Sequence, residues 1–394
     1  MDIQIRQAGE ADYREIARID GISFGVSYTE EDFEHIFGED PPRFLVAVQD
    51  DRLVGISGDF RFTMTVPGGG VLDLPGVTWV SVLPTHRRRG VLRALLDEQL
   101  AGYAAAGEPA TVLTASEGGI YRRFGFGPAT QSVKISIERR LATLLNPVDS
   151  AAVEFVAAGS ARAPITELHR RWSELTPGGL GRSEGWWDHL MRDRPSQRDG
   201  MSEKIYLVHP DGYLAYRSAA QWHDGHAANR CVITDYRCVT AEAHAALWQV
   251  LLGMDLFTSI ESWEVPLDDP LPFLLSDPRQ VRLIANKDGM WLRPIDVAAM
   301  LSARRYLVPI EAVIEVGDQR VLLEGGPDAA RCQPTERAVD VRFSVPALGS
   351  AYLGGHRVRT LARAGLVQAE NASLIGQLDL ALSADRAPAY GTAF

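Results

Sequence analysis

The 394-residue sequence contains only three cysteines, Cys231, Cys238 and Cys332. Three scattered thiols are too few for a disulfide framework and lack the spacing of a zinc site, so they indicate reduced thiols and no bound metal. The chain also lacks an apolar run of 18 residues, and its first residues are polar, without the basic start and apolar stretch of a signal peptide. We therefore expect a cytoplasmic protein that does not span a membrane.

Positive charge is in deficit, with 40 Lys and Arg residues against 51 Asp and Glu residues and a formal net charge of -11. Proteins that bind nucleic acid usually present a net basic face, so this balance argues against a nucleic-acid partner and mildly favours cationic substrates. The composition, 46% hydrophobic and 23% charged, is that of a folded globular protein. At roughly 100–200 residues per domain, the length allows about two to four domains.

The first third of the chain predicts antiparallel strands that lead into a crossover. Residues 43–49, 53–66 and 71–83 have the alternation and turn boundaries of strands. Residues 91–106 place apolar side chains on one helical face, and residues 111–115 form a short apolar strand. Because a strand, a helix and a returning strand form a crossover unit, we expect 71–83 and 111–115 to be parallel neighbours.

A basic turn, Thr85-His86-Arg87-Arg88-Arg89-Gly90, immediately precedes the crossover helix. The first N–H groups of a helix have no intrahelical partner and carry partial positive charge, and a glycine lets the backbone approach a ligand closely. This combination suits the pyrophosphate of a cofactor. A solvated basic turn or a nucleic-acid patch is the alternative interpretation, which the preceding apolar strand and the following helix make less favourable.

Two stretches resemble a known family when they are taken together. PTHRRRGVLRALL at 84–96 resembles the R/Q-x-x-G-x-G/A cofactor loop of GNAT N-acetyltransferases, although Val91 and Leu92 stand at the second glycine position. TASEGGIYRRFGFGPAT at 114–130 resembles the HASEGGIYGRFGYGPAT segment of the Eis (enhanced intracellular survival) family of acetyltransferases. The last eight residues, 387–394, resemble the P-x-x-G-T-x-F ending of that family.

The resemblance covers the whole chain and implies a mixed α/β and α+β architecture. The expected domains are a catalytic GNAT fold at 1–145, a degenerate second GNAT fold at 146–292 and an α+β domain like a sterol carrier protein at 293–394. Each GNAT fold is expected to have a mixed, mostly antiparallel sheet with helices. The second fold repeats the order of strands, helix and strand over 205–265 but lacks the basic turn with its glycine. The resemblance also implies a homohexamer, built as a dimer of trimers.

The activity that the resemblance implies is direct acetyl transfer from acetyl-CoA to an amine of a small molecule, such as an aminoglycoside or a polyamine. It assigns Tyr121 as the general acid, and a phenol with an ordinary pKa near 10 is protonated at neutral pH. It assigns the terminal carboxylate of Phe394 as the general base. Because an α-carboxyl group has an ordinary pKa of about 3.3–3.7, such a base needs burial or a relay through water. The alternative interpretations are that Tyr121 is a structural residue of the core and that Phe394 is the end of a frayed terminus.

Further site residues follow from the same resemblance. Backbone and side chains of the strand end, the basic turn and the second motif would contact acetyl-CoA: Val80, Ser81, Val82, Arg87, Arg88, Arg89, Gly90, Val91, Leu92, Arg93, Ser116 and Glu117. A pocket for a polycation needs acids for its charges and aromatics to cover sugar rings. The candidates for this pocket are Phe24, Glu30, Phe33, Glu34, Phe37 and Trp79.

Three positions depart from the family and reduce the negative charge of the expected pocket. Thr114 stands where a histidine is common, while Val26 and Ala393 stand where acids occur. Two other function classes therefore stay open. One is acetylation of lysine side chains in proteins or peptides, which needs an open groove. The other is a non-catalytic binder of lipid or acetyl-CoA that uses the domain like a sterol carrier protein.

Overall fold

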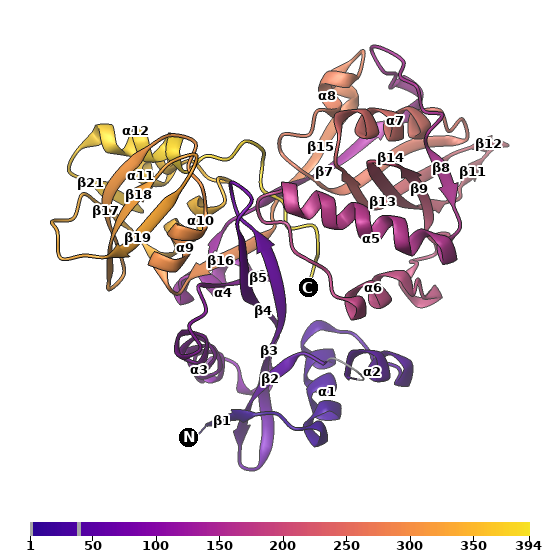
Figure 1. Cartoon of the computed structure of the whole chain (residues 1–394). Helices are drawn as coiled ribbons and strands as arrows, with labels where there is room; N and C mark the ends of the chain where they lie inside the picture. Colours follow the sequence, from indigo (N-terminus) through magenta and orange to yellow (C-terminus); the bar gives the residue numbers. More distant parts are fainter. Residues whose placement is uncertain (1–2, 38–40) are drawn as a thin grey trace. The chain divides into compact units, whose positions relative to one another are not determined.

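The computed structural model describes residues 3–37 and 41–394, which form two compact units (Figure 1). Unit 1 contains the residues up to 129 together with 290–385 and 392–394, and unit 2 contains 130–289 and 386–391. Within the described ranges, no helix is both long and apolar enough to cross a bilayer. The division into three domains, with boundaries after residues 145 and 292, stays a prediction.

The larger sheet of unit 1 has seven strands in the order β1-β2-β3-β4-β5-β16-β6. Neighbouring strands are antiparallel except β4 and β5, which are parallel and joined by the predicted crossover helix. Strand β16 had not been expected in this sheet, where it pairs with both β5 and β6. The strands are β1 (Gln4–Gln7), β2 (Arg43–Gln49), β3 (Arg52–Thr65), β4 (Val71–Val82), β5 (Ala110–Thr114), β6 (Gly127–Pro128) and β16 (Met290–Pro294).

The crossover helix α3 buries the apolar face that its spacing predicted. Val91, Leu95 and Leu96 recur at helical spacing and are almost fully buried against the sheet. The helix stops just before Gly107, whose φ of 74° is accessible to glycine without the steric cost of a Cβ. The helices of this part of unit 1 are α1 (Tyr13–Phe24), α2 (Glu30–Phe37), α3 (Val91–Ala105) and α4 (Gly118–Tyr121).

A second sheet in unit 1 has five strands in the order β19-β18-β17-β20-β21. Strands β17 and β18 form an antiparallel hairpin in this sheet. Strand β20 ends at residue 343 and a helix follows, with Pro346 in its first turn, where the missing N–H of proline has no intrahelical acceptor. The elements are α9 (Val297–Ala303), β17 (Ile310–Val316), β18 (Gln319–Gly325), β19 (Ala330–Pro334), β20 (Val341–Phe343), α10 (Val345–Tyr352), α11 (Val358–Arg363), β21 (Val367–Ala369) and α12 (Ala372–Ala381).

Arg304 is fully buried beside this second sheet. Its guanidinium donates to the carbonyl of Tyr352 at the end of α10, and to the carbonyls of Ala381 and Ser383 at the end of α12, at 3.5 and 3.3 Å. The carbonyls at a helix C-terminus have no intrahelical partner and carry partial negative charge, so a cation suits them. One side chain therefore joins the ends of two helices.

Unit 2 has a seven-stranded sheet in the order β15-β7-β14-β13-β10-β9-β8 and a small hairpin of β11 and β12. Its single parallel pair, β13 and β14, is joined by helix α7. This repeats the β4-α3-β5 arrangement and confirms the predicted order of elements. The elements are β7 (Gln131–Glu138), β8 (Glu154–Val156), α5 (Ala158–Leu175), α6 (Glu184–Met191), β9 (Ile205–His209), β10 (Gly212–Ala219), β11 (Trp222–His223), β12 (His226–Ala227), β13 (Asn229–Cys238), α7 (Ala241–Leu252), β14 (Phe257–Val265), α8 (Leu271–Leu274) and β15 (Val281–Asp288).

Candidate active site

The sheet of unit 1 opens between its two parallel strands. The ladder of β4 and β5 has only two residue pairs and ends at Val77 and Leu113. Beyond them β4 continues to Val82 and β5 to Thr114. Within this part of β4, the register with β3 shifts by one residue and Trp79 adopts a left-handed φ of 52°. Such a bulge bends a strand, so the backbone of β4 past Val77 no longer pairs with β5.

The predicted donor-binding strand end lies along this opening. Val80 packs at the edge of the hydrophobic cluster beneath it. The hydroxyl of Ser81 is instead turned into the core, where it donates to Asp20 at 2.9 Å, and Tyr28 donates to the other oxygen of Asp20 at 2.7 Å. Burial raises the pKa of Asp20, and these two hydrogen bonds oppose the rise. Ser81 can therefore offer a ligand its backbone groups rather than its hydroxyl.

The N-terminus of α3 has the features of an anion site. Gly90 caps the helix with a φ of 89°, and a Cβ placed there would meet no atom within 4 Å. In this fully described helix, no side chain caps the first turn and no acidic residue lies in it. The N–H groups of the first turn thus keep their capacity for a ligand, and the exposed arginines Arg87, Arg88 and Arg89 stand beside them. The residues present fit a pyrophosphate group, with Arg93 exposed one turn on.

Tyr121 lies at the closed end of the opening. It ends the short helix α4, is 5% exposed, and belongs to one hydrophobic cluster with Val77 and Leu113, the last ladder pair. Burial raises the pKa of Tyr121 to about 12, and a hydrogen bond with Ser116 opposes the rise. Glu117, the residue before α4, is exposed. The phenol of Tyr121 is therefore protonated at neutral pH.

The last residue, Phe394, is packed against the same two strands. The hydroxyl of Thr114, where β5 ends, donates to the terminal oxygen of Phe394 at 2.7 Å. The ring of Phe394 lies 4.8 Å from that of Phe62, centroid to centroid. It also passes over Gly76 so closely that a Cβ there would come within 2.8 Å of it. The terminal carboxylate and the Tyr121 side chain thus lie at the same break in the sheet.

Two of the predicted substrate residues line a cleft of about 420 Å³ in unit 1. Glu30 and Phe33 contribute to this cleft together with Val26 and residues of α1. Arg14 forms an ion pair with Glu30 at 2.9 Å and lies 4.6 Å above the ring of Phe33. The carboxylate of Glu30 therefore already has a cationic partner within the chain.

The other predicted substrate residues are distributed differently. Phe37 is buried and packs edge-on against Trp79, with ring centroids 5.7 Å apart, in an aromatic cluster under the opening. Phe24 is half exposed at the end of α1. Glu34 lies in α2, but its side chain falls outside the described part of the chain.

Several contributors to this site had no recognisable sequence signal. Asp20 is an acid within the apolar face of α1, which could have marked it as a buried, hydrogen-bonded group. Thr114 was notable only as a departure from the family. Phe62 and Gly76 stand in ordinary strand sequence, and their role depends on a residue more than 300 positions away.

Known protein families match the chain in three places. A GNAT acetyltransferase domain matches residues 4–129, another GNAT acetyltransferase domain matches 178–294, and a sterol carrier protein domain matches 297–391. The predicted fold class is thereby confirmed. The fold and the site define an acetyltransferase of the GNAT class, which takes its acetyl group from acetyl-CoA.

Individual relatives narrow this class. The N-acetyltransferase Eis of Mycobacterium tuberculosis is 38% identical over 343 residues, which cover 85% of this chain and 84% of the relative. An uncharacterized N-acetyltransferase of Streptomyces coelicolor is 35% identical over 352 residues. The crystal structure of Eis1 from Mycobacterium abscessus superposes with a TM-score of 0.88 at 34% identity, and the match covers 100% of both chains. The chain belongs to the Eis family of N-acetyltransferases.

Proposed function

We propose that this acetyltransferase acetylates amines of aminoglycosides or polyamine-like small molecules by direct transfer, with Tyr121 as general acid and the terminal carboxylate of Phe394 as general base. The observation that supports this best is the convergence of the two groups on one break in the sheet. Tyr121 packs with Val77 and Leu113, and the carboxylate of Phe394 accepts a hydrogen bond from Thr114. Both ends of a proton-transfer path are thus provided.

The residues divide the work of the transfer between them. Acetyl-CoA supplies the acetyl group as a thioester. The N-terminus of α3, Gly90 and the neighbouring arginines hold the pyrophosphate. The backbone of β4 at Val80 and Val82, which does not pair with β5, aligns the arm that carries the thioester. Ser116 fixes the hydroxyl of Tyr121. The remaining side chains affect the transfer by positioning these groups.

The proton inventory balances with these two residues alone. The carboxylate of Phe394 takes a proton from the attacking neutral amine as the C–N bond forms. Tyr121 gives its proton to the sulfur as the C–S bond breaks, and its raised pKa ensures that this proton is present. The hydrogen bond from Thr114 holds one carboxylate oxygen and so fixes the orientation of the base.

The proposed substrate class rests on charge and size. The net charge of -11 favours cations, and a cleft of about 420 Å³ suits a small molecule rather than a peptide chain. We assign Phe24, Phe33 and Trp79 to the apolar part of this substrate region. Because Glu30 is already paired and Val26 is uncharged, we expect modestly charged polyamines to bind better than highly charged aminoglycosides.

The decisive experiment extends the chain by one alanine after Phe394, which moves the terminal charge by one residue. We expect the release of free thiol from acetyl-CoA, measured with a panel of polyamines, aminoglycosides and lysine peptides, to fall about 100-fold or more, because a positioned base contributes about that much. Acetyl-CoA binding should remain within about twofold. The intact mass of the purified wild-type protein verifies that Phe394 is its last residue.

The matched control adds one alanine at the N-terminus, which should leave the rate unchanged. A Tyr121→Phe variant tests the other proton path and should lose turnover while retaining acetyl-CoA binding. Full activity of the C-terminally extended protein would remove Phe394 as the base. Thiol release with lysine peptides alone would replace the small-molecule substrate by a protein, and binding of acetyl-CoA without any release would indicate a non-catalytic protein.

The homohexamer implied by the family resemblance is also kept as a proposal. Unit 2 exposes large apolar side chains, among them Phe273 at 83% and Leu283 at 64% exposed. Apolar surface of this kind is typical of contacts between subunits. Sedimentation equilibrium should give six chains per particle, and a monomer at micromolar concentration would contradict the proposal.

A further inference from the structure

The sheet of unit 2 has the same kind of opening as the sheet of unit 1. Strands β13 and β14 form a parallel ladder that ends at Ile233 and Ser262. Beyond this pair β13 continues to Cys238 and β14 to Val265. Helix α7 makes the crossover between them, as α3 does between β4 and β5. By position in the fold, this second opening corresponds to the one assigned to acetyl-CoA in unit 1.

The helix beside the second opening is closed to a phosphate. The side chain of Thr240 caps α7 by accepting a hydrogen bond from the N–H of Ala243 at 3.2 Å. Glu242 adds a negative charge to the first turn. Both features satisfy or neutralise the groups that α3 leaves available, so the fold has kept the opening but not the anion site.

The C-terminal segment bonds to the strand ends at this second opening. Arg237 of β13 donates to the carbonyl of Gly391 at 2.7 Å, and the hydroxyl of Tyr390 bonds to Glu264 of β14 at 3.2 Å. Both strand residues lie beyond the last ladder pair. The carbonyl of Tyr390 also accepts from the N–H of Leu180 at 3.0 Å. Residues 390 and 391 thus bond to both strands of the opening.

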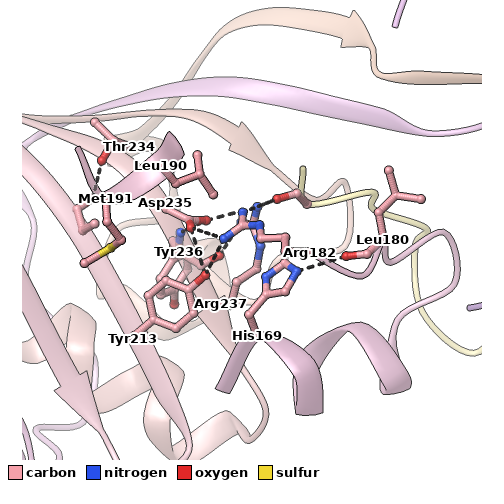
Figure 2. A network of polar contacts seen from close by, with 12 residues as sticks. His169, Leu180, Arg182, Leu190, Met191, Tyr213, Thr234, Asp235, Tyr236 and Arg237 are labelled. Atoms are coloured by element: carbon pink, nitrogen blue, oxygen red, sulfur yellow. Dashed lines mark hydrogen bonds and ion pairs between the residues drawn. The ribbon is translucent and has the colours of Figure 1, made fainter. Parts of the chain in front are cut away.

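The carbonyl of Gly391 is held by a buried ionic cluster. Figure 2 shows three of its members, Arg182, Asp235 and Arg237. Arg182 donates to this oxygen at 2.6 Å, so it is shared by two guanidinium groups. Asp235 lies 3.0 Å from Arg182 and 3.2 Å from Arg237, and accepts from Tyr213 at 2.9 Å. Figure 2 shows these side chains converging beside the yellow ribbon of the C-terminal segment.

Each member of the cluster contributes to its balance of buried charge. Burial by itself would raise the pKa of Asp235, but the charges of Arg182 and Arg237 outweigh it and hold this pKa below its ordinary value. One carboxylate compensates two guanidinium groups, and the backbone carbonyl of Gly391 supplies the further negative pole. The ring of Trp172 packs against the guanidinium of Arg237 at 4.7 Å and covers Gly391. A peptide segment is therefore a built-in member of this cluster.

We propose that unit 2 serves as a receptor for the C-terminal segment, and that Arg182, Asp235 and Arg237 are positioning residues for the terminal carboxylate. The proposal rests on the proposed role of Phe394 as the base. Phe394 lies three positions after Gly391 in the chain. At about 3.3–3.6 Å per residue, a held Gly391 confines the carboxylate to within about 11 Å, whereas a free segment from residue 386 would sweep a far larger volume.

Two variants test the receptor from different sides. Arg237→Met removes a charged donor. Gly391→Ala keeps every charge of the cluster, but it places a Cβ within 2.4 Å of Trp172 and 3.2 Å of Nε of Arg237, at a φ of 70° that alanine disfavours. We expect kcat to fall about 10-fold or more in both, with acetyl-CoA affinity within twofold. The pH profile of kcat should keep its shape, because the base itself remains. Amide hydrogen exchange of 386–394 should accelerate.

The controls separate this proposal from the assignment of the base. Gly225→Ala also changes a glycine of unit 2 with positive φ, 81°, but in open space, and it should leave kcat and exchange of the tail unchanged. Arg237→Lys should recover part of the lost rate, because it keeps the charge. If the C-terminal extension abolishes turnover while both receptor variants keep wild-type kcat and tail protection, the receptor is overturned and the base stands. If the receptor variants speed tail exchange but the extended chain stays active, it is the base that fails.

Discussion

Gly76 offers a sharp test of how tightly the tail must be held. A Cβ at this position would lie 2.6 Å from Cε2 of Phe62 and 2.8 Å from Cε2 of Phe394. Ordinary contact begins near 3.4 Å, so the two rings would have to withdraw by about 0.8 and 0.6 Å, the differences from 3.4 Å. Gly76→Ala should thus displace the ring of Phe394 by less than 1 Å, with no change in charge.

The size of the effect follows from this displacement. A misplacement of about 1 Å in a reacting group can cost about 100-fold in rate, so we expect Gly76→Ala to lower kcat by about 10- to 100-fold, or about 1.4–2.7 kcal/mol in the activation free energy. Overpacking should cost about 1–3 kcal/mol of the free energy of unfolding. The acetyl-CoA dissociation constant should hardly change, because Gly76 precedes the unpaired end of β4.

The assay is steady-state thiol release with the best amine, accompanied by urea unfolding of each variant. Phe62→Leu in the Gly76→Ala background removes the closer of the two rings and should restore part of the rate. Gly102→Ala, on α3 with no atom within 4 Å of its Cβ, controls for the added methyl group. Wild-type kcat in Gly76→Ala, with the fold intact, would refute the idea that the ring of Phe394 positions the carboxylate.

Three further predictions concern stability and donor binding. Arg304→Met should lower the free energy of unfolding by about 1–3 kcal/mol in urea titrations, because it removes the donor to buried carbonyls at two helix ends. No measurable loss would contradict this. Burial and the charges of Arg182 and Arg237 lower the pKa of His169 to about 3, so the stability that neutral His169 contributes is complete above the unfolded pKa near 6.5 and is lost as pH falls toward 3. Relative to His169→Gln, the free energy of unfolding of the wild type should drop by up to about 1.4 kcal/mol per pH unit between these values. Parallel curves of stability against pH for the two proteins would contradict this prediction. Gly90→Ala should weaken acetyl-CoA binding about 10-fold in a titration. Gly107→Ala, which has a similar positive φ at the other end of α3, should only destabilise the fold. Equal affinities of the two variants for acetyl-CoA would show that Gly90 is not part of the acetyl-CoA site.

Local patterns were sufficient for much of the fold. The crossover helix α3 follows from apolar spacing, its start from Gly90 and its end from Gly107, and all three signals lie within 20 residues. The hairpin of β17 and β18 is equally local. Strand β16 could not be placed, because a five-residue apolar segment does not specify a partner, and its partner β5 lies some 180 residues earlier.

The site was predictable only in part for the same reason. Tyr121 and the basic turn belong to contiguous motifs, so the sequence alone marked them. The bond between Thr114 and Phe394 joins residues 280 positions apart. Asp20 accepts a hydrogen bond from Ser81, which lies 61 positions later, and the sequence around neither residue indicates the other as its partner. Contacts of this kind are set by the folded topology and leave no local periodicity.

The packing of the last residue makes chain length a variable as specific as any side chain. The carbonyl of Gly391 and the carboxylate of Phe394 are both fixed by hydrogen bonds, with only Thr392 and Ala393 between them. A deleted codon there would shorten the segment by about 3.3–3.6 Å, and an added one would lengthen it by as much. With Phe394 in its proposed role as the base, the number of residues after Gly391 is therefore as specific a requirement as the identity of a side chain at the site.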